Sequence, residues 1–598
     1  MKQGDALSCA IFIICIDPLL RNLNKNRKIG QIKVGKYSGI RYKAAAYADD
    51  ISIMCKNDKA SIQEVFNEYG KLTRRSGLEL NADKTEILIL NDEAKVTFNV
   101  NYNRSSFNIE TVDNIKICGL FFCTSKKEEY ERNVHDKIKK LTNKIRAWSH
   151  RHLTMEGKSL IVKTFGLSQL IYNMQAYNYE KAELDNIEKI IFKFLWSKTE
   201  TQNGIDRIRR SVMKNDYQNG GMSITDVDCL NRSLKLRQFF RARTSNHAIA
   251  EIQKITMGSD KVLNEYIPKT TLESICNIAL ETINIITDYS RTLFEEMQEE
   301  MYENDTLTIN GVSSINLKKY FRRKSKTFIS CMLITLTNNG ICSLGELTQA
   351  FEFEIDTRLS KSMKIILQNI PEKLRMISRC YNENINSDEE NMTHIMTTHG
   401  EWLKLDEITV KQLQIILKKA MSKVESLDVS KKVQIQDFNC KNIVTFREQC
   451  KNPKLRNIYF RLIHNDFFPH SRMKKYKMTN SDKCPRCDEV ETTKHMLWEC
   501  AHVQNIWRLF NELTSKMRLE NEHVTIYDDI YKPGKTAAIS LIKIRVIQEL
   551  IQIVRPTNWD EGKMKNICNE LLKMEKYNAM TTRTNHKFIV KWQKILQI

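Results

Sequence analysis

The spacing of apolar residues divides this chain into a mixed front part and a helical remainder. Residues 6–16 form an apolar run that is typical of a buried helix. Two short runs, 40–48 and 51–55, are predicted to pair as a hairpin that turns near two adjacent aspartates. Apolar residues recur at helical spacing over 61–72, so a second helix is expected there.

The pattern changes further along the chain. Strands are expected at 86–90 and 96–100, because a turn signal at Asn91-Asp92 separates two short apolar runs. Beyond them, apolar residues recur every three or four positions, which predicts a helix over 134–148. Only eight prolines occur in 598 residues, so helices are expected to dominate the remainder. The predicted fold class is therefore α+β, with the strands near the front.

The charge of the chain indicates a polyanionic partner. It carries 94 Lys and Arg against 72 Asp and Glu, a net charge of +22, and nucleic acid is the usual partner of such a surplus. A basic protein without such a partner is the plain alternative. The sixteen cysteines form no dense disulfide framework, which is typical of a reducing, intracellular compartment. The apolar run at 6–16 is too short to span a bilayer, so no membrane partner is expected.

Tyr47-Ala48-Asp49-Asp50 is the most informative stretch for chemistry. A hairpin turn with two adjacent carboxylates can hold Mg²⁺ or Mn²⁺, because these ions prefer hard oxygen ligands. Two such ions can stabilise the attacking and leaving oxygens of a phosphoryl transfer. Two alternatives stay open from these residues alone: a solvated acidic turn without a ligand, and a metal-dependent nuclease.

Three other blocks flank the aspartate pair in a fixed order. Residues 2–8 (KQGDALS) precede it, and residues 77–86 (GLELNADKTE) and 115–120 (IKICGL) follow it. In this order and spacing, the four blocks resemble the later palm motifs of a reverse transcriptase of the non-LTR (LINE-type) retrotransposon class. The segments at 194–196 (FLW) and 220–224 (GGMSI) resemble those that follow the thumb in that family.

The resemblance covers residues 1–225 and 450–510 and implies an architecture. It implies a partial right-hand polymerase palm, built from an antiparallel hairpin and helices, then a helical thumb, a mostly α connector and a small zinc knuckle. The expected segments are a partial palm at 1–125, thumb and post-thumb helices at 126–230, a helical connector of unknown role at 231–440, a zinc-knuckle region at 441–515 and a helical tail at 516–598. The tail sequence lacks a Pro-Asp nuclease signature, so no nuclease activity is expected of it.

The resemblance implies RNA-directed DNA synthesis, primed from a nicked chromosomal target. The partners would be an RNA template, a DNA primer or target and deoxynucleoside triphosphates, in the nucleus and in cytoplasmic ribonucleoprotein. Asp49 and Asp50 would be the catalytic, magnesium-binding residues, and Gly119 would contact the primer. The residues that would bind nucleotide or template are Gln3, Gly4, Tyr47, Ala48 and Lys84. The sequence leaves the oligomeric state open.

The family carries fingers and the first half of the palm ahead of the glycine block, including another metal-binding aspartate. Asp17 follows the glycine block, where the family has a helix ending in a similar Asp-Pro-Leu-Leu, so a structural role is expected for it. We therefore expect this chain to be the C-terminal portion of the polymerase. The alternative function is a non-catalytic remnant that binds nucleic acid through the thumb and the zinc knuckle.

Cys484, Cys487, His495 and Cys500 follow the spacing C-x2-C-x7-H-x4-C. Three thiolates and one imidazole can close a tetrahedral zinc site without an open position, so a structural or docking role is expected rather than hydrolysis. The resemblance also implies a zinc knuckle at this place. His502 is the rival ligand for His495 but falls outside the spacing, and four unlinked residues are the plain alternative.

Two basic clusters are candidates for nucleic-acid binding. The candidate residues are Lys137, Lys140 and Lys144 on the predicted thumb helix, and Arg472, Lys474 and Lys475 before the zinc knuckle. Each phosphate that they neutralise would add to the salt dependence of binding. For the thumb helix, a solvated basic face without a ligand is the alternative.

Overall fold

The structure of the chain is a computed structural model. It describes residues 7–30, 43–48, 50–90, 95–197, 205–243, 252–253, 275–286, 288–289, 292, 394–396, 402–404, 407–421, 428–436, 438–552, 559–582 and 592. Gln3, Gly4, Asp49 and the turn expected at 91–92 lie outside the described residues, as does most of the connector expected at 231–440.

The chain forms two compact units, each assembled from separate stretches of sequence. The first unit comprises Met1–His135, Asn173–Tyr179 and Asp228–Met421, and the second comprises Asp136–Tyr172, Glu180–Val227 and Ser422–Ile598. Helices dominate the described residues, and the strands there form antiparallel hairpins of two strands each, compatible with the α+β class. Among the described helices, none has the length and apolar character needed to cross a bilayer.

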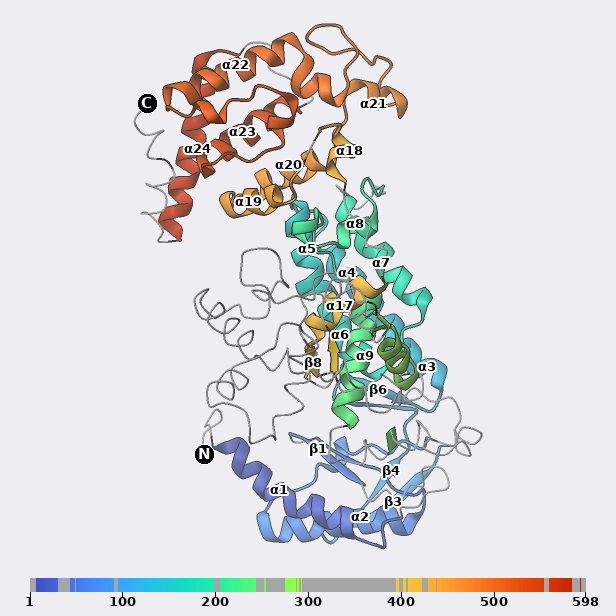
Figure 1. The fold of residues 1–598 in the computed structure, drawn as a ribbon. Coiled ribbons are helices and arrows are strands. Elements are labelled where there is room, and N and C mark those ends of the chain that lie inside the picture. The colour runs from blue at the N-terminus through green and yellow to red at the C-terminus, as the bar shows by residue number, and fades with distance from the viewer. Residues whose placement is uncertain are drawn as a thin grey trace, which may run out of the picture. The chain divides into compact units, whose positions relative to one another are not determined.

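Helices and a hairpin open the first unit (Figure 1). α1 (Ser8–Lys25) contains most of the expected first helix and continues beyond it. The expected burial of 6–16 is wrong, because Ile11, Ile13 and Ile14 are exposed and Ile16 is the described residue of this run that is buried. β1 (Ala44–Tyr47) pairs antiparallel with β2 (Asp50–Ile53), which confirms the predicted hairpin. α2 (Lys59–Ser76) confirms the second predicted helix. These elements share a small core made of Leu19, Leu23, Ile29, Ala44 and Val65.

The ends of α2 show how local sequence sets an element. The Asp58 side chain accepts a hydrogen bond from the Ser61 N–H at 2.7 Å, which satisfies one of the free donors of the first turn. At the other end Gly77 adopts the left-handed conformation (φ +73°) that closes many helices. The residues that begin and end α2, Asp58 and Gly77, are adjacent to it in sequence, so the position of this helix can be predicted from the sequence alone.

Two further hairpins complete the strands at the front of the first unit. β3 (Thr97–Tyr102) pairs with β4 (Ser105–Glu110) and packs against α2, and β5 (Asn114–Ile117) pairs with β6 (Leu120–Cys123). β3 confirms the strand expected at 96–100. The short helical turn η1 (Ala82–Lys84) precedes these hairpins.

The strand expected at 86–90 is wrong. In this run Ile87 makes a single isolated bridge, to Thr111, and no ladder forms. The run is tied to the chain just after β4 at this one point, where the Val112 N–H donates to the Ile87 carbonyl. It contributes Ile89 to the core beside α2. The apolar residues therefore marked a segment that packs on the core, and such packing does not require a ladder of strand hydrogen bonds.

The first unit continues with helices and one more hairpin. Its remaining elements include α3 (Lys126–Tyr130), the π-helical turn η2 (Glu131–His135), α9 (Val227–Arg243), β7 (His394–Met396), β8 (Trp402–Lys404) and α17 (Val410–Met421). The buried Asn133 side chain donates to the Phe121 and Glu129 carbonyls and accepts from the Phe121 N–H. These bonds fix β6 to the helical turn that follows it.

Helices from the predicted thumb open the second unit. The elements here are α4 (Asp136–Arg146), α5 (Met155–Ile161), the π-helical turn η3 (Val162–Leu167), α7 (Lys181–Trp196), α8 (Arg210–Lys214) and the short turn η4 (Tyr217–Asn219). α6 (Ser168–Ala176) follows η3, and its residues from Asn173 on belong to the first unit. α4 buries Ile138, Leu141 and Ile145 on one face, which confirms the helical periodicity read from the sequence.

The second unit also contains the described C-terminal helices, which Figure 1 draws in orange and red. They are α18 (Val429–Val433), α19 (Lys441–Gln449), α20 (Pro453–Ile463), α21 (His470–Lys475), the π-helical turn η6 (His495–Glu499), α22 (Ala501–Lys516), the short turns η7 (Glu520–Glu522) and η8 (Tyr527–Ile530), α23 (Ala537–Leu550) and α24 (Glu561–Thr581). One continuous apolar core joins them, from Val429 to Trp592.

Candidate metal centres and nucleic-acid surface

The carboxylate turn lies at the tip of the β1–β2 hairpin. Tyr47 and Asp50 are partners in the strand register, so a two-residue turn connects them. Ala48 opens that turn in the left-handed region, with φ +54°. Tyr47 is 71% exposed, and Asp50 is exposed at the start of β2. The Asp50 carboxylate therefore faces water, where a hydrated cation can reach it.

Lys84 and Gly119 occupy two other loops of the first unit. Lys84 is exposed at the end of η1, and its N–H donates to the Asn81 side chain. Gly119 forms the turn of the β5–β6 hairpin together with Cys118, and both have positive φ (+85° and +48°). Two consecutive left-handed residues make the tight turn that suits a twisted hairpin. Glycine at 119 also leaves the backbone open to close approach.

The four predicted zinc ligands come together in the second unit. One ligand atom from each of Cys484, Cys487, His495 and Cys500 lies within 4.8 Å of the others. Cys487 Sγ is 3.1 Å from His495 Nε2 and 3.7 Å from Cys500 Sγ. Cys484, His495 and Cys500 are buried, and Cys487 is partly buried. Three sulfurs and one imidazole nitrogen in so small a volume fit a closed tetrahedral zinc site.

The backbone around the cluster explains its geometry. The Cys484 N–H donates to the Glu489 carbonyl at 2.6 Å, and the Asp488 N–H donates back to the Cys484 carbonyl at 3.1 Å. This tight turn brings Cys484 and Cys487 together. Cys500 ends η6 and is the residue from which α22 starts.

The rival ligand His502 does not join the cluster. It is exposed on the first turn of α22, two residues beyond Cys500. His495 lies instead at the start of η6, with its Nε2 toward the Cys487 sulfur. The histidine that the sequence spacing predicts as the ligand, His495, is therefore the one that lies with the three cysteines.

Arg486 lies between two of the ligands and is the least expected feature of the site. The three guanidinium nitrogens are buried, and none of them has a hydrogen-bond partner. Burial lowers the pKa of Arg486, whereas the sulfurs of Cys500, Cys484 and Cys487 act to raise it. The sequence offered no signal for this burial, because arginine in a short turn is usually solvated.

The six basic residues predicted to bind nucleic acid differ in exposure and in the protein groups that they contact. Lys140 and Lys144 are exposed on α4, and Lys137 is half-buried. Arg472 donates to the carbonyls of Asn465 and Phe467 at 2.6 and 2.7 Å, so its guanidinium anchors the start of α21.

Two lysines complete the second cluster. Lys474 pairs with Asp482 at 3.1 Å, and Lys475 is exposed. The surface most available to phosphates, among the candidates, is therefore Lys140 and Lys144 on α4 and Lys475 on α21.

Within the second unit, partly buried ion pairs and one buried hydrogen bond join α5 and the turn after η4 to the segment before the cysteine–histidine cluster. Glu156 of α5 pairs with Arg447 at 2.7 Å and with Arg456 at 3.1 Å. His464 Nε2 lies 2.6 Å from the Gly220 carbonyl, and burial lowers the His464 pKa to about 3. The imidazole of His464 is therefore neutral, and its Nε2–H can donate the hydrogen bond to the Gly220 carbonyl. Sequence reasoning missed these contacts, because the partners are far apart along the chain.

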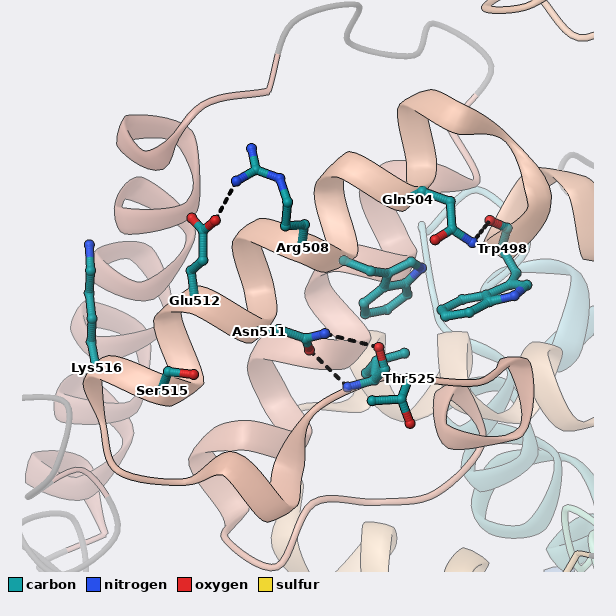
Figure 2. Close-up of a pocket in the computed structure, with 10 residues that line it drawn as sticks. Trp498, Gln504, Arg508, Asn511, Glu512, Ser515, Lys516 and Thr525 are labelled. Atoms are coloured by element: carbon teal, nitrogen blue, oxygen red, sulfur yellow. Dashed lines mark hydrogen bonds and ion pairs between the residues drawn. The ribbon is translucent and has the colours of Figure 1, made fainter.

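A groove of about 620 Å³ follows α22 beyond the zinc cluster (Figure 2). Its polar side chains are satisfied internally: Asn511 exchanges hydrogen bonds with the Val524 backbone, Gln504 donates to the Trp498 carbonyl, and Arg508 pairs with Glu512. The groove therefore presents few unsatisfied groups that could orient a ligand, and we assign none to it.

Comparison with protein-family models gives two matches. Residues 1–129 match the family described as reverse transcriptase (RNA-dependent DNA polymerase). Residues 426–507 match the family described as zinc-binding in reverse transcriptase. The first match contains the carboxylate turn, and the second contains all four ligands of the cluster. The resemblance to a reverse transcriptase with a C-terminal zinc-binding segment is thereby confirmed.

Proposed function

We propose that this chain forms the later palm, the thumb and the zinc segment of a non-LTR (LINE-type) retrotransposon polymerase, which copies RNA into DNA by target-primed reverse transcription. The observation that carries the proposal is the exposed hairpin turn at Tyr47–Asp50, inside the segment that matches reverse transcriptases. The reaction is attack of a primer 3′-hydroxyl on the α-phosphate of a deoxynucleoside triphosphate, with release of pyrophosphate.

The residues of the first unit take roles that fit their exposure. Asp50, with Asp49, would hold Mg²⁺ or Mn²⁺, which stabilises charge on the attacking and leaving oxygens when bound. Lys84 would lie near the triphosphate and offset its charge. Gly119 would let the primer backbone approach the β5–β6 turn. The protein's share of such a reaction is mostly positioning and electrostatic stabilisation.

The zinc segment takes a structural and docking role in this proposal. Cys484, Cys487, His495 and Cys500 would fill all four positions around Zn²⁺, which leaves none for a reacting water. Exposed lysines on α4 and α21 would contact the phosphates of RNA and DNA. Nuclear and ribonucleoprotein location is part of the same proposal.

A binding-only function is the second candidate. The zinc cluster and the exposed lysines Lys140, Lys144 and Lys475 need no carboxylate chemistry to hold nucleic acid. A chain that binds RNA and DNA but extends no primer would have this function.

Primer extension separates the two candidates. On an RNA template with a DNA primer, we expect Asp50→Asn to lower the extension rate on the order of 10²-fold or more, because one metal ligand is removed. The matched control is Asp113→Asn, a carboxylate of the first unit that is 54% exposed and pairs with Lys95 at 3.4 Å. Extension that survives Asp50→Asn contradicts the catalytic role. Binding by the wild-type chain without any extension supports the second candidate.

Salt-dependent binding tests the thumb surface. We expect Lys140→Ala with Lys144→Ala to weaken binding of RNA–DNA duplexes of any sequence. The slope of log K against log salt should fall by about 2, one for each phosphate that is no longer neutralised. Lys95→Ala is the control, because Lys95 is exposed in the first unit and pairs with Asp113. An unchanged slope in the double variant means that the two lysines form only a solvated face.

A further inference from the structure

The Arg486 guanidinium is a buried charge without a partner. Its Nε, Nη1 and Nη2 atoms are all shielded from solvent, and no hydrogen-bond acceptor reaches them. A cation removed from water without compensation is costly, so buried charges in proteins are paired or lie beside a metal centre. Either a counter-charge is supplied at this position, or the arginine destabilises the turn it lies in.

The carboxylates around the knuckle do not supply that charge. Asp482 pairs with Lys474, Asp488 with Lys483, Glu491 with His470 and Glu499 with Lys494, at 2.7 to 3.1 Å. None of these acids contacts Arg486. Arg486 itself stands between two of the ligands, in the turn from Cys484 to Cys487, and its guanidinium is enclosed there. The sulfurs of Cys484, Cys487 and Cys500 act to raise its pKa, in keeping with that position.

A zinc-loaded site would carry a negative charge, which can compensate the positive charge of Arg486. Zn²⁺ with three cysteine thiolates and one neutral imidazole carries a net charge of −1. In a poorly hydrated site such a charge acts more strongly on a neighbouring cation than it would in water. Arginine suits the position, because its guanidinium stays charged at all ordinary pH values and is weakly hydrated.

We infer that Arg486 is the counter-ion of a zinc–thiolate centre formed by Cys484, Cys487, His495 and Cys500. It holds the centre neutral, strengthens zinc binding and reduces the reactivity of the bound thiolates toward electrophiles. The inference rests on zinc occupying the cluster, as in the proposed function. It adds a residue outside the ligand set, and it does not depend on polymerase activity.

The test compares three substitutions at Arg486 with one neighbouring control. Arg486→Met and Arg486→Gln remove the charge, and Arg486→Lys keeps it. Lys483→Met removes a positive charge next to Cys484, but from a side chain that is 55% exposed and pairs with Asp488. The readouts are the zinc Kd from competition with a chromophoric chelator, and the rate of N-ethylmaleimide alkylation at Cys484, Cys487 and Cys500 in the zinc-loaded chain. Alkylation is followed peptide by peptide, because Cys15, Cys118 and Cys440 are exposed and also react.

We expect Arg486→Met and Arg486→Gln to weaken zinc binding by about 10- to 100-fold, the usual effect of residues that support metal ligands, and to speed alkylation. Arg486→Lys should stay close to the wild type, as should Lys483→Met. If the methionine variant does not fold, the glutamine and lysine variants give the same comparison. Wild-type affinity in the uncharged variants overturns the inference, as does an equal weakening in the lysine variant. A wild-type chain that binds no zinc overturns the zinc site itself.

Discussion

Cys487→Ser will release zinc and loosen the described C-terminal helices as a whole, well beyond the knuckle. Removing one thiolate leaves three ligands and breaks the tetrahedral site, so the free energy of metal binding no longer supports the fold. For small zinc domains that free energy is about 10–16 kcal/mol. Because this unit has a large apolar core besides the metal, we expect a smaller destabilisation, on the order of 5 kcal/mol.

The loosening spreads because the ligands are part of the core. Cys484 and Cys500 belong to the same apolar cluster as Trp507 and Phe510 of α22 and the buried face of α23. The Trp507 indole N–H also donates to the Leu497 carbonyl, at 2.8 Å, inside the turn that carries His495. Removal of the metal therefore frees the turn on which α22 is packed.

Hydrogen exchange measures this effect region by region. Chelation or Cys487→Ser should raise exchange across 441–550, while the β1–β2 and β3–β4 hairpins of the first unit keep their protection. His502→Ala is the matched control, because His502 is exposed and lies outside the cluster. Unchanged exchange across 441–550 after chelation would contradict a structural zinc site.

The elements that could be predicted from the sequence are those that depend on residues close together in the chain. The helical periodicity of 134–148 and the pattern around the β1–β2 turn depend on neighbours a few residues away, and both elements are present. The cysteine spacing worked for the same reason, since one tight turn holds Cys484 and Cys487, and one short helical turn holds His495 and ends at Cys500.

What the sequence could not predict depends on distant partners. The strand expected at 86–90 is wrong, because this run packs Ile89 into the core beside α2 and makes an isolated bridge at Ile87 instead of a ladder. The His464 side chain forms a hydrogen bond with the Gly220 carbonyl, 244 residues earlier in the chain. Neither segment has a sequence pattern that predicts this contact. The burial of the Arg486 guanidinium, which the surrounding fold encloses, was not predicted from the sequence. The periodicity of apolar residues predicts which face of a helix or strand is buried, but it does not predict which distant segment packs on that face.

The Gly-Gly pair after η4 illustrates a constraint of that tertiary kind. Gly220 has φ +74°, and its carbonyl accepts the bond from His464 of the segment after α20. The Gly221 N–H donates to the Asp216 carbonyl at 3.0 Å, and the next residue, Met222, bonds back to Met213. The chain is therefore folded closely onto α8 at this point.

Gly221→Ala will destabilise the second unit severely. A Cβ at this position would lie 2.0 Å from the Asn215 carbonyl oxygen and 2.7 Å from that of Val212. Both are backbone atoms held by hydrogen bonds, so neither can move aside as a flexible side chain would. Relief requires the turn to leave α8 and to break the hydrogen bond with His464. We expect a destabilisation of at least about 3 kcal/mol.

Gly157→Ala is the matched control in the same unit. Gly157 lies in the first turn of α5, where an added Cβ meets nothing closer than 3.5 Å, and alanine favours a helix over glycine by about 0.5–1 kcal/mol. Urea-dependent proteolysis within the second unit should show early cleavage for Gly221→Ala and equal or later cleavage for Gly157→Ala. If both variants resist proteolysis like the wild type, the Gly220–His464 hydrogen bond does not hold the turn after η4 to the segment after α20. The two segments would then contribute separately to the stability of the second unit.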